Sequence, residues 1–130
     1  MNPRILIADD ETSVRLALAR WFSIRGFDVT EAADGQEAVE AVERVSFDIV
    51  LLDLEMPRLH GLDALALMRE AQPGLRVVVL SGYARDKARA WDRGAALVLS
   101  KPIRLAVLEQ HVREVLEDPA AGTDPTAAPA

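Results

Sequence analysis

The 130-residue chain has no cysteine, no hydrophobic run long enough to span a membrane and no excess of basic residues. Without cysteine, neither disulfides nor thiolate metal sites can hold the fold or carry the chemistry, which fits a reducing compartment. The apolar stretch near the N-terminus, Ile5 to Ala8, runs straight into acids and is too short for a signal-peptide core. We therefore expect a cytoplasmic protein without a membrane segment.

The formal net charge of -6 at pH 7 argues against a general nucleic-acid-binding surface. Such binding depends on clustered Lys and Arg side chains that neutralise phosphates. The length suits one domain with a single substantial core, which we place in residues 1–117. Residues 118–130 contain three prolines and no bulky apolar side chain, so we expect a disordered tail or an interdomain linker there.

Five short apolar runs, each of strand length, alternate with four amphipathic stretches and one weaker polar segment. The runs are Ile5 to Ala8, Phe27 to Thr30, Ile49 to Leu52, Val77 to Leu80 and Leu97 to Leu99. Regular alternation of this kind indicates crossover units and a parallel sheet. The expected fold class is α/β.

Helical spacing and capping signals define several of the connecting segments. The expected core face of the first helix consists of Val14, Ala17, Leu18, Trp21 and Phe22. The corresponding face of the last helix consists of Leu105, Leu108, Val112, Val115 and Leu116. Asp34 and Glu37 form an acidic variant of a capping box. Preceding helices are expected to end at Gly26, Gly74 and Gly94.

Polar, chemically capable residues follow four of the five apolar runs. They are Asp9 and Asp10 after the first run, Asp53 after the third, Ser81 after the fourth, and Ser100 and Lys101 after the fifth. In an open parallel sheet the carboxyl ends of the strands share one edge, and ligands bind where the strand order reverses. The second run has no such residue, which suits an edge strand. The order 2-1-3-4-5 would then place Asp9, Asp10 and Asp53 in one pocket.

Three neighbouring carboxylates repel one another, so at least one should keep its proton unless a cation is present. Mg²⁺ fits best, because it is a hard ion that prefers oxygen ligands and often shares its site with phosphate oxygens. A carboxylate exposed beside Mg²⁺ can attack phosphorus and form an aspartyl phosphate. Lys101 would place a positive charge on the phosphoryl oxygens, and the hydroxyl of Ser81 would donate a hydrogen bond to them.

Residues 4 to 117 resemble the receiver domain of two-component response regulators. The motifs that carry the resemblance are the acid pair Asp9-Asp10, DLEMPRLHG from Asp53 to Gly61, LSGYA from Leu80 to Ala84, and SKP from Ser100 to Pro102. Each is weak alone, but together, in this order and at these spacings, they are very specific. The resemblance implies a single doubly wound (βα)5 domain of the flavodoxin-like kind.

The resemblance also implies roles for the acidic residues. Asp53 matches the phosphoacceptor, Asp9 and Asp10 the acid pair that serves Mg²⁺, and the backbone carbonyl of Glu55 the remaining protein ligand. The phosphoryl donor would be a histidine kinase or a histidine phosphotransfer protein. Such a domain is a signalling module, which catalyses only its own phosphorylation and slow autodephosphorylation.

Other matched positions concern the switch itself. Ser81 matches the switch hydroxyl and Lys101 the phosphate-binding lysine, and the Lys101-Pro102 peptide bond is typically cis in this family. Glu55 and Tyr83 occupy the positions that flank the path of the hydrolytic water. One departure is Val98, where receivers commonly carry Tyr or Phe as a rotamer switch, so the signal would depend on the fourth helix and its preceding loop.

In receivers the fourth helix, fifth strand and fifth helix form the common output surface. Here the fourth helix carries a run of basic residues, Arg85, Lys87, Arg89 and Arg93, so we expect this surface to contact an effector domain or a downstream protein. A homodimer that forms on phosphorylation is a further partner that the resemblance allows. No effector domain fits within these residues, which predicts either a single-domain regulator or a receiver from a longer protein.

Several alternatives remain open at this point. Asp10 could simply cap the first helix, and Asp53 taken alone could be an ordinary strand-end residue. A haloacid-dehalogenase-type phosphatase also uses an Asp nucleophile and Mg²⁺, but its nucleophile lies on the first strand, whereas Asp53 lies on the third. Val98 leaves room for a receiver-like interaction module that works without phosphorylation.

Overall fold

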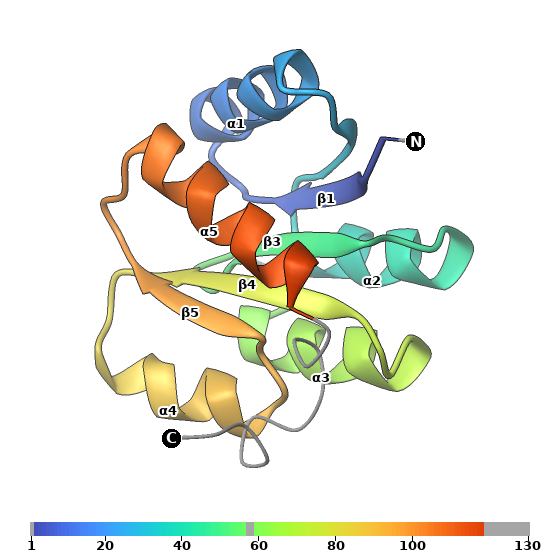
Figure 1. Ribbon diagram of the computed structural model, residues 1–130. Coiled ribbons are helices and arrows are strands. Elements are labelled where there is room, and N and C mark those ends of the chain that lie inside the picture. The colour runs from blue at the N-terminus through green and yellow to red at the C-terminus, as the bar shows by residue number, and fades with distance from the viewer. Residues whose placement is uncertain (1, 57–58, 119–130) are drawn as a thin grey trace.

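The computed structural model describes residues 2–56 and 59–118, and it consists of five strands alternating with five helices (Figure 1). The predicted tail lies outside these residues from position 119 onward. The strands are β1 (Arg4–Ala8), β2 (Asp28–Ala32), β3 (Ile49–Asp53), β4 (Arg76–Ser81) and β5 (Leu97–Ser100). The helices are α1 (Thr12–Ile24), α2 (Gly35–Arg44), α3 (Gly61–Ala71), α4 (Arg85–Asp92) and α5 (Leu105–Glu117). None of the described helices is long and apolar enough to cross a membrane.

The strands form one parallel sheet in the order β2-β1-β3-β4-β5, which confirms the predicted fold class and topology. The second strand does lie at an edge, although it begins at Asp28, one residue later than predicted. Phe27 instead packs its ring edge-on against Phe22, with 5.1 Å between the ring centroids. The register pairs Asp53 with Leu80 and Ser81 with Ser100, so the reactive strand ends lie level with one another.

Helices cover both faces of the sheet, and each face has its own apolar cluster (Figure 1). Alternate residues of β3 point to opposite faces: Val50 and Leu52 join the cluster under α2, α3 and α4, while Ile49 and Leu51 join the cluster under α1 and α5. All four side chains are buried. Burial on both faces explains why the central strands read as continuous apolar runs and not as alternating ones.

Part of the predicted core face of α1 is wrong. Leu18 and Phe22 are buried as expected, but Val14 and Ala17 are exposed. These two residues line a groove of about 560 Å³ whose opposite wall includes Leu105 and Leu108 of α5. The first turns of α1 therefore face this groove and do not pack into the core.

A cluster of side chains around Glu109 ties the C-terminal part of α1 to α5. Glu109 accepts hydrogen bonds from Trp21 Nε1 at 2.9 Å and from Arg113 Nε at 2.8 Å, and Arg25 Nε lies 3.5 Å from its Oε1. The hydrogen bond from Arg113, together with these neighbours, lowers the pKa of Glu109. The two helices are thus held together around Glu109, and between their first turns lies the groove that Asp9 and Lys101 also line.

The capping signals are largely confirmed. Asp34 Oδ1 accepts from the backbone of Glu37 at 2.8 Å, and Glu37 Oε1 accepts from the backbone of Ala33 at 3.0 Å. Gly26 and Gly94 end their helices with positive φ angles of 92° and 94°. The prediction for Gly74 is wrong, because α3 already ends at Ala71 and Gly74 is not left-handed.

Gly61, the first residue of α3, makes the closest backbone approach that bears on the sheet edge. A Cβ atom added there would lie 2.5 Å from Leu54 Cα, and the Gly61 N–H donates to the Leu54 carbonyl at 3.2 Å. Leu54 directly follows Asp53. The absence of a side chain at Gly61 therefore lets α3 fix the backbone next to the predicted phosphoacceptor.

Replacing Gly61 with Ala should lower the free energy of unfolding by about 1–3 kcal/mol, the usual effect of forcing an extra carbon into a packed site. The matched control is Gly74→Ala, because a Cβ atom there meets nothing within 4 Å and the φ angle is not positive. That variant should change stability by less than about 1 kcal/mol. Urea unfolding of both variants checks this, and equal stability of Gly61→Ala and wild type would contradict it.

Candidate functional site

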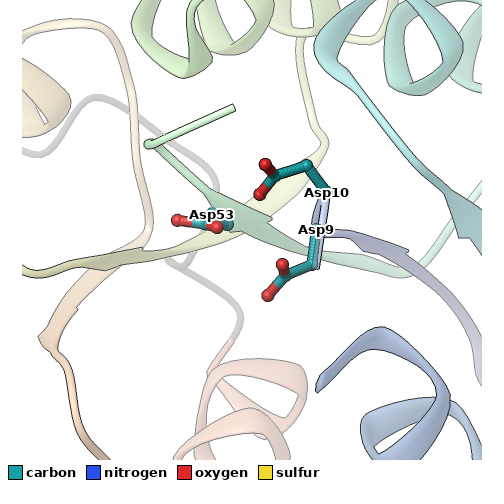
Figure 2. Close-up of side chains that lie close together, drawn as sticks. All are labelled: Asp9, Asp10 and Asp53. Atoms are coloured by element: carbon teal, nitrogen blue, oxygen red, sulfur yellow. The ribbon is translucent and has the colours of Figure 1, made fainter. Parts of the chain in front are cut away.

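The carboxyl ends of β1 and β3 bring three acids together. Asp9 and Asp10 follow β1, Asp53 ends β3, and each offers a carboxylate oxygen within 4.8 Å of the others (Figure 2). The three acids that the strand order was expected to bring together therefore lie close to one another. Only oxygen ligands meet here, and their spacing suits a small divalent cation that keeps several waters, so the residues fit Mg²⁺.

The two acids of the pair are held differently. Asp9 is 4% exposed, and its Oδ1 accepts a hydrogen bond from the backbone of Glu11 at 2.9 Å. Asp10 is exposed and does not cap α1, whose N-cap residue is Glu11 and has no side-chain capping bond. The alternative of Asp10 as a helix cap is therefore not supported. Its carboxylate instead adds an oxygen to the cluster.

Burial makes negative charge at this site costly. Asp53 is 4% exposed, and burial raises its pKa to about 6, although hydrogen bonds from Lys101 and from the backbone of Glu55 act in the opposite direction. Burial also raises the pKa of Asp9, and the neighbouring charge of Asp10 adds to the effect. Two partly desolvated carboxylates beside an exposed one favour a bound cation.

Lys101 reaches the cluster from the end of β5. Its Nζ lies 2.9 Å from Asp53 Oδ1 and 3.3 Å from Glu55 Oε1. Burial lowers the pKa of Lys101, but the hydrogen bond and the charge of Asp53, with a further contribution from Glu55, outweigh it and raise the pKa overall. The Lys101-Pro102 peptide bond is cis, as the resemblance implied. Lys101 is thus a protonated partner of Asp53.

Ser81 lies at the end of β4, where its carbonyl accepts a hydrogen bond from the backbone of Lys101 at 2.9 Å. The side chain is buried and its hydroxyl is bonded to Tyr83: it accepts from the Tyr83 N–H at 3.0 Å and donates to the Tyr83 carbonyl at 3.2 Å. The residue is where the sequence predicted it to be. Both of its hydroxyl hydrogen bonds, however, go to the backbone of the loop that follows β4.

Sequence reasoning missed two contacts of the site. Arg15 donates to the backbone carbonyl of Asp9 at 2.8 Å and to Glu31 at 3.1 Å, which fixes the backbone of the acid pair against β2. The sequence did contain a signal for this contact, because Arg15 lies one turn into the helix that follows Asp9 and Asp10. The Glu55 side chain, expected beside the water path, bonds to Lys101 and to the Gly82 N–H. No pattern in the sequence indicated that contact.

Most of the basic residues predicted for the output surface are exposed. Arg85 and Arg89 are exposed on α4, Arg93 is exposed directly after the helix ends, and Trp91 is half-buried. Val98 is also half-buried and packs against the cluster under α2, α3 and α4. An aliphatic residue thus occupies the position at which the family commonly has an aromatic ring.

Comparison with known proteins agrees with this geometry. Residues 5–113 match the response regulator receiver domain family. The transcriptional activator protein PfeR of Pseudomonas aeruginosa is 37% identical over 116 residues, which are 88% of this chain and 38% of that protein. The chain therefore spans well under half the length of this relative.

Two solved structures extend the comparison. A CheY-like response regulator receiver domain protein from Methanospirillum hungatei has a TM-score of 0.87 at 26% identity, over 90% of this chain and 95% of that one. The response regulator TrrA of Thermotoga maritima, solved in complex with Mg²⁺ and BeF, has a TM-score of 0.79 at 27% identity, over 88% and 98% of the two chains. With the match over residues 5–113, they show that this chain belongs to the response regulator receiver domain family.

Proposed function

We propose that Asp53 accepts a phosphoryl group and that the domain is thereby switched within a two-component or phosphorelay system. The observation that carries this proposal is the environment of Asp53: a desolvated carboxylate with its pKa raised to about 6, between an acid pair and Lys101. Structural acids at strand ends are normally solvated. A carboxylate kept buried beside two others and a lysine suits nucleophilic attack on phosphorus.

Asp9, Asp10, Asp53 and the backbone carbonyl of Glu55 would hold Mg²⁺. When bound, the ion neutralises the clustered carboxylates and the charge of the incoming phosphoryl oxygens. The solved complex of TrrA with Mg²⁺ and BeF supports this assignment, since beryllofluoride mimics a phosphoryl group. The Asp9 carbonyl stays fixed by Arg15, which keeps the acid pair oriented toward Asp53.

In the transfer step an oxygen of the Asp53 carboxylate forms a bond to phosphorus. The bond from phosphorus to the donor breaks, and its electron pair stays on the leaving atom. For a phosphohistidine donor that atom is an imidazole nitrogen, which takes up a proton; for acetyl phosphate it is an acetate oxygen. Lys101, kept protonated by Asp53 and Glu55, then places its charge on the phosphoryl oxygens. Water later attacks phosphorus and releases inorganic phosphate, which restores the carboxylate.

The donor would be a histidine kinase or a histidine phosphotransfer protein. Its imidazole has to come within bonding distance of Asp53, so its surface must cover the neighbouring residues. The groove between α1 and α5 opens beside Asp9 and Lys101, and its walls are mainly apolar. Val14 and Ala17, which are exposed on the α1 side, would be covered by such a donor.

The output surface would be formed by α4, β5 and α5. The exposed basic residues of α4 give this region a charge opposite to that of the whole chain, which suits an acidic surface on an effector domain, a downstream protein or a second copy. Phosphorylation need only favour the active conformer by a few kcal/mol, since about 5.5 kcal/mol moves a two-state equilibrium from 1:99 to 99:1.

Acetyl phosphate with Mg²⁺ should label the wild-type protein once, and Asp53→Asn should abolish the labelling because the amide is not a nucleophile. The matched control is Asp63→Asn, which makes the same exchange at an exposed position on α3 and should label normally. Intact-protein mass spectrometry measures the product. Labelling that persists in Asp53→Asn would contradict the assignment.

Two further measurements, turnover of phosphate monoesters and binding of beryllofluoride, separate the rival functions. A phosphatase of the haloacid-dehalogenase type would release phosphate continuously from phosphate monoesters, whereas a receiver would not. A receiver-like module that works without phosphorylation would take no label and bind no beryllofluoride with Mg²⁺. Either result would contradict the proposal.

Stability should depend on pH through Asp53. Its pKa rises from 3.8 in the unfolded chain to about 6 in the folded one, so the folded state binds the proton more tightly. The metal-free protein should therefore lose stability as pH rises from about 4 to about 6, by up to about 3 kcal/mol from this group. Asp53→Asn lacks this penalty and should be more stable than wild type near pH 7.5. Near pH 4.5 its gain in stability over wild type should be smaller.

Urea midpoints of the two proteins, each with chelator and with Mg²⁺, measure the effect. Mg²⁺ should reduce the difference in stability between Asp53→Asn and wild type at the higher pH. A cation that binds only the folded wild-type protein stabilises that protein by mass action. If Asp53→Asn destabilised the metal-free protein equally at both pH values, Asp53 would instead be a structural ion-pair residue.

A further inference from the structure

The carboxylate of Glu55 bridges two loops at the edge of the sheet. Its Oε1 accepts a hydrogen bond from the Gly82 N–H at 3.0 Å and lies 3.3 Å from Lys101 Nζ. Its Oε2 is buried and has no hydrogen-bond partner among the described residues. A buried carboxylate oxygen without a partner is unfavourable, so this bridge is less stable than a fully paired carboxylate would be.

A phosphoryl group on Asp53 would need the lysine that Glu55 contacts. Lys101 Nζ lies 2.9 Å from Asp53 Oδ1, so the ammonium is next to the place where the phosphoryl oxygens arrive. A phosphoryl group brings up to two negative charges and three acceptor oxygens, against the single charge of Glu55. Two anions beside one ammonium repel each other, and the more highly charged one attracts it more strongly. Phosphorylation should therefore displace Glu55.

The neighbouring hydroxyl is engaged in the same loop. Ser81 donates its only proton to the Tyr83 carbonyl and accepts from the Tyr83 N–H. Because a hydroxyl has one proton, Ser81 must release this carbonyl before it can donate to a phosphoryl oxygen. The contacts that hold residues 81–83 thus include the hydrogen bond that Gly82 N–H donates to Glu55 and the two hydrogen bonds between the Ser81 hydroxyl and the backbone of Tyr83.

This loop leads directly into α4. The helix begins at Arg85, whose guanidinium carbon lies 5.4 Å from the centroid of the Tyr83 ring, within the range of a cation–π contact. A displacement of Tyr83 therefore reaches the start of the basic helix through a side-chain contact. The route does not pass through Val98, which packs into the apolar cluster and has no ring to reorient.

We propose that the Glu55 carboxylate is a resting-state latch: it occupies Lys101 and the Gly82 N–H, and its displacement frees the β4–α4 loop to carry the signal to α4. The inference rests on the proposed phosphorylation of Asp53 and extends it to the transmission of the signal. Glu55 acts here through its side chain. That role is separate from the metal ligand proposed for its backbone carbonyl.

Removing the charge of Glu55 should make beryllofluoride bind more tightly. At saturating Mg²⁺, the Kd of Glu55→Gln and of Glu55→Ala should fall roughly ten-fold, the effect of losing one competing hydrogen bond between charged groups. Amide NMR titration measures this. In the absence of beryllofluoride, the Gly82 and Tyr83 amide resonances of both variants should shift toward their positions in the beryllofluoride-bound wild type.

The matched control is Glu70→Gln, which makes the same change in net charge at an exposed position on α3 and should alter neither the Kd nor these resonances. Equal or weaker beryllofluoride binding by Glu55→Gln, with normal binding by wild type, would overturn the latch alone. Unmoved Gly82 and Tyr83 resonances in both variants would overturn it as well. Failure of wild type to bind beryllofluoride with Mg²⁺ would instead contradict the proposed function.

Discussion

Everything at this site follows from one constraint, the negative charge of Asp53 at the end of a strand that is buried on both faces. A carboxylate in such a place is stable only if positive charge is brought to it. Lys101 provides part of that charge through a contact of 2.9 Å, yet the pKa of Asp53 remains raised to about 6. The lysine alone therefore does not offset the cost of burying this charge, and the proposed cation would supply the rest.

The fold produces this imbalance by geometry. A parallel register brings the ends of β1, β3, β4 and β5 to the same edge, while α3 holds the backbone after Asp53 through the close approach of Gly61 to Leu54. Around Glu109, α1 and α5 are bound together, and toward the site they leave a groove. This groove, where the proposed donor would bind, thus lies next to Asp9 and Lys101.

The sequence predicts what depends on strand position. The strand order and the meeting of Asp9, Asp10 and Asp53 follow from apolar runs and the residues after them, because a parallel sheet leaves the strand ends few alternatives. What depends on side-chain direction could not be predicted. Helical spacing placed Val14 in the core, but it lines the groove, because spacing identifies a face without showing how far the neighbouring helix extends. The bridge from Glu55 to Gly82 depends on a rotamer, for which no pattern exists.

Val98 has no aromatic ring that could act as the rotamer switch common in this family. In our proposal the contacts of Glu55, Ser81 and Tyr83 would transmit the signal through the β4–α4 loop instead. The proposed phosphorylation and the proposed signal transmission both depend on the Asp53 carboxylate being destabilised by burial. The most direct test is to measure the pKa of the Asp53 carboxyl group by NMR, from the chemical shift of its carbon, with and without Mg²⁺. The account predicts a pKa near 6 in the metal-free protein and a marked fall when Mg²⁺ binds. A pKa near 3.8 that Mg²⁺ leaves unchanged would contradict it.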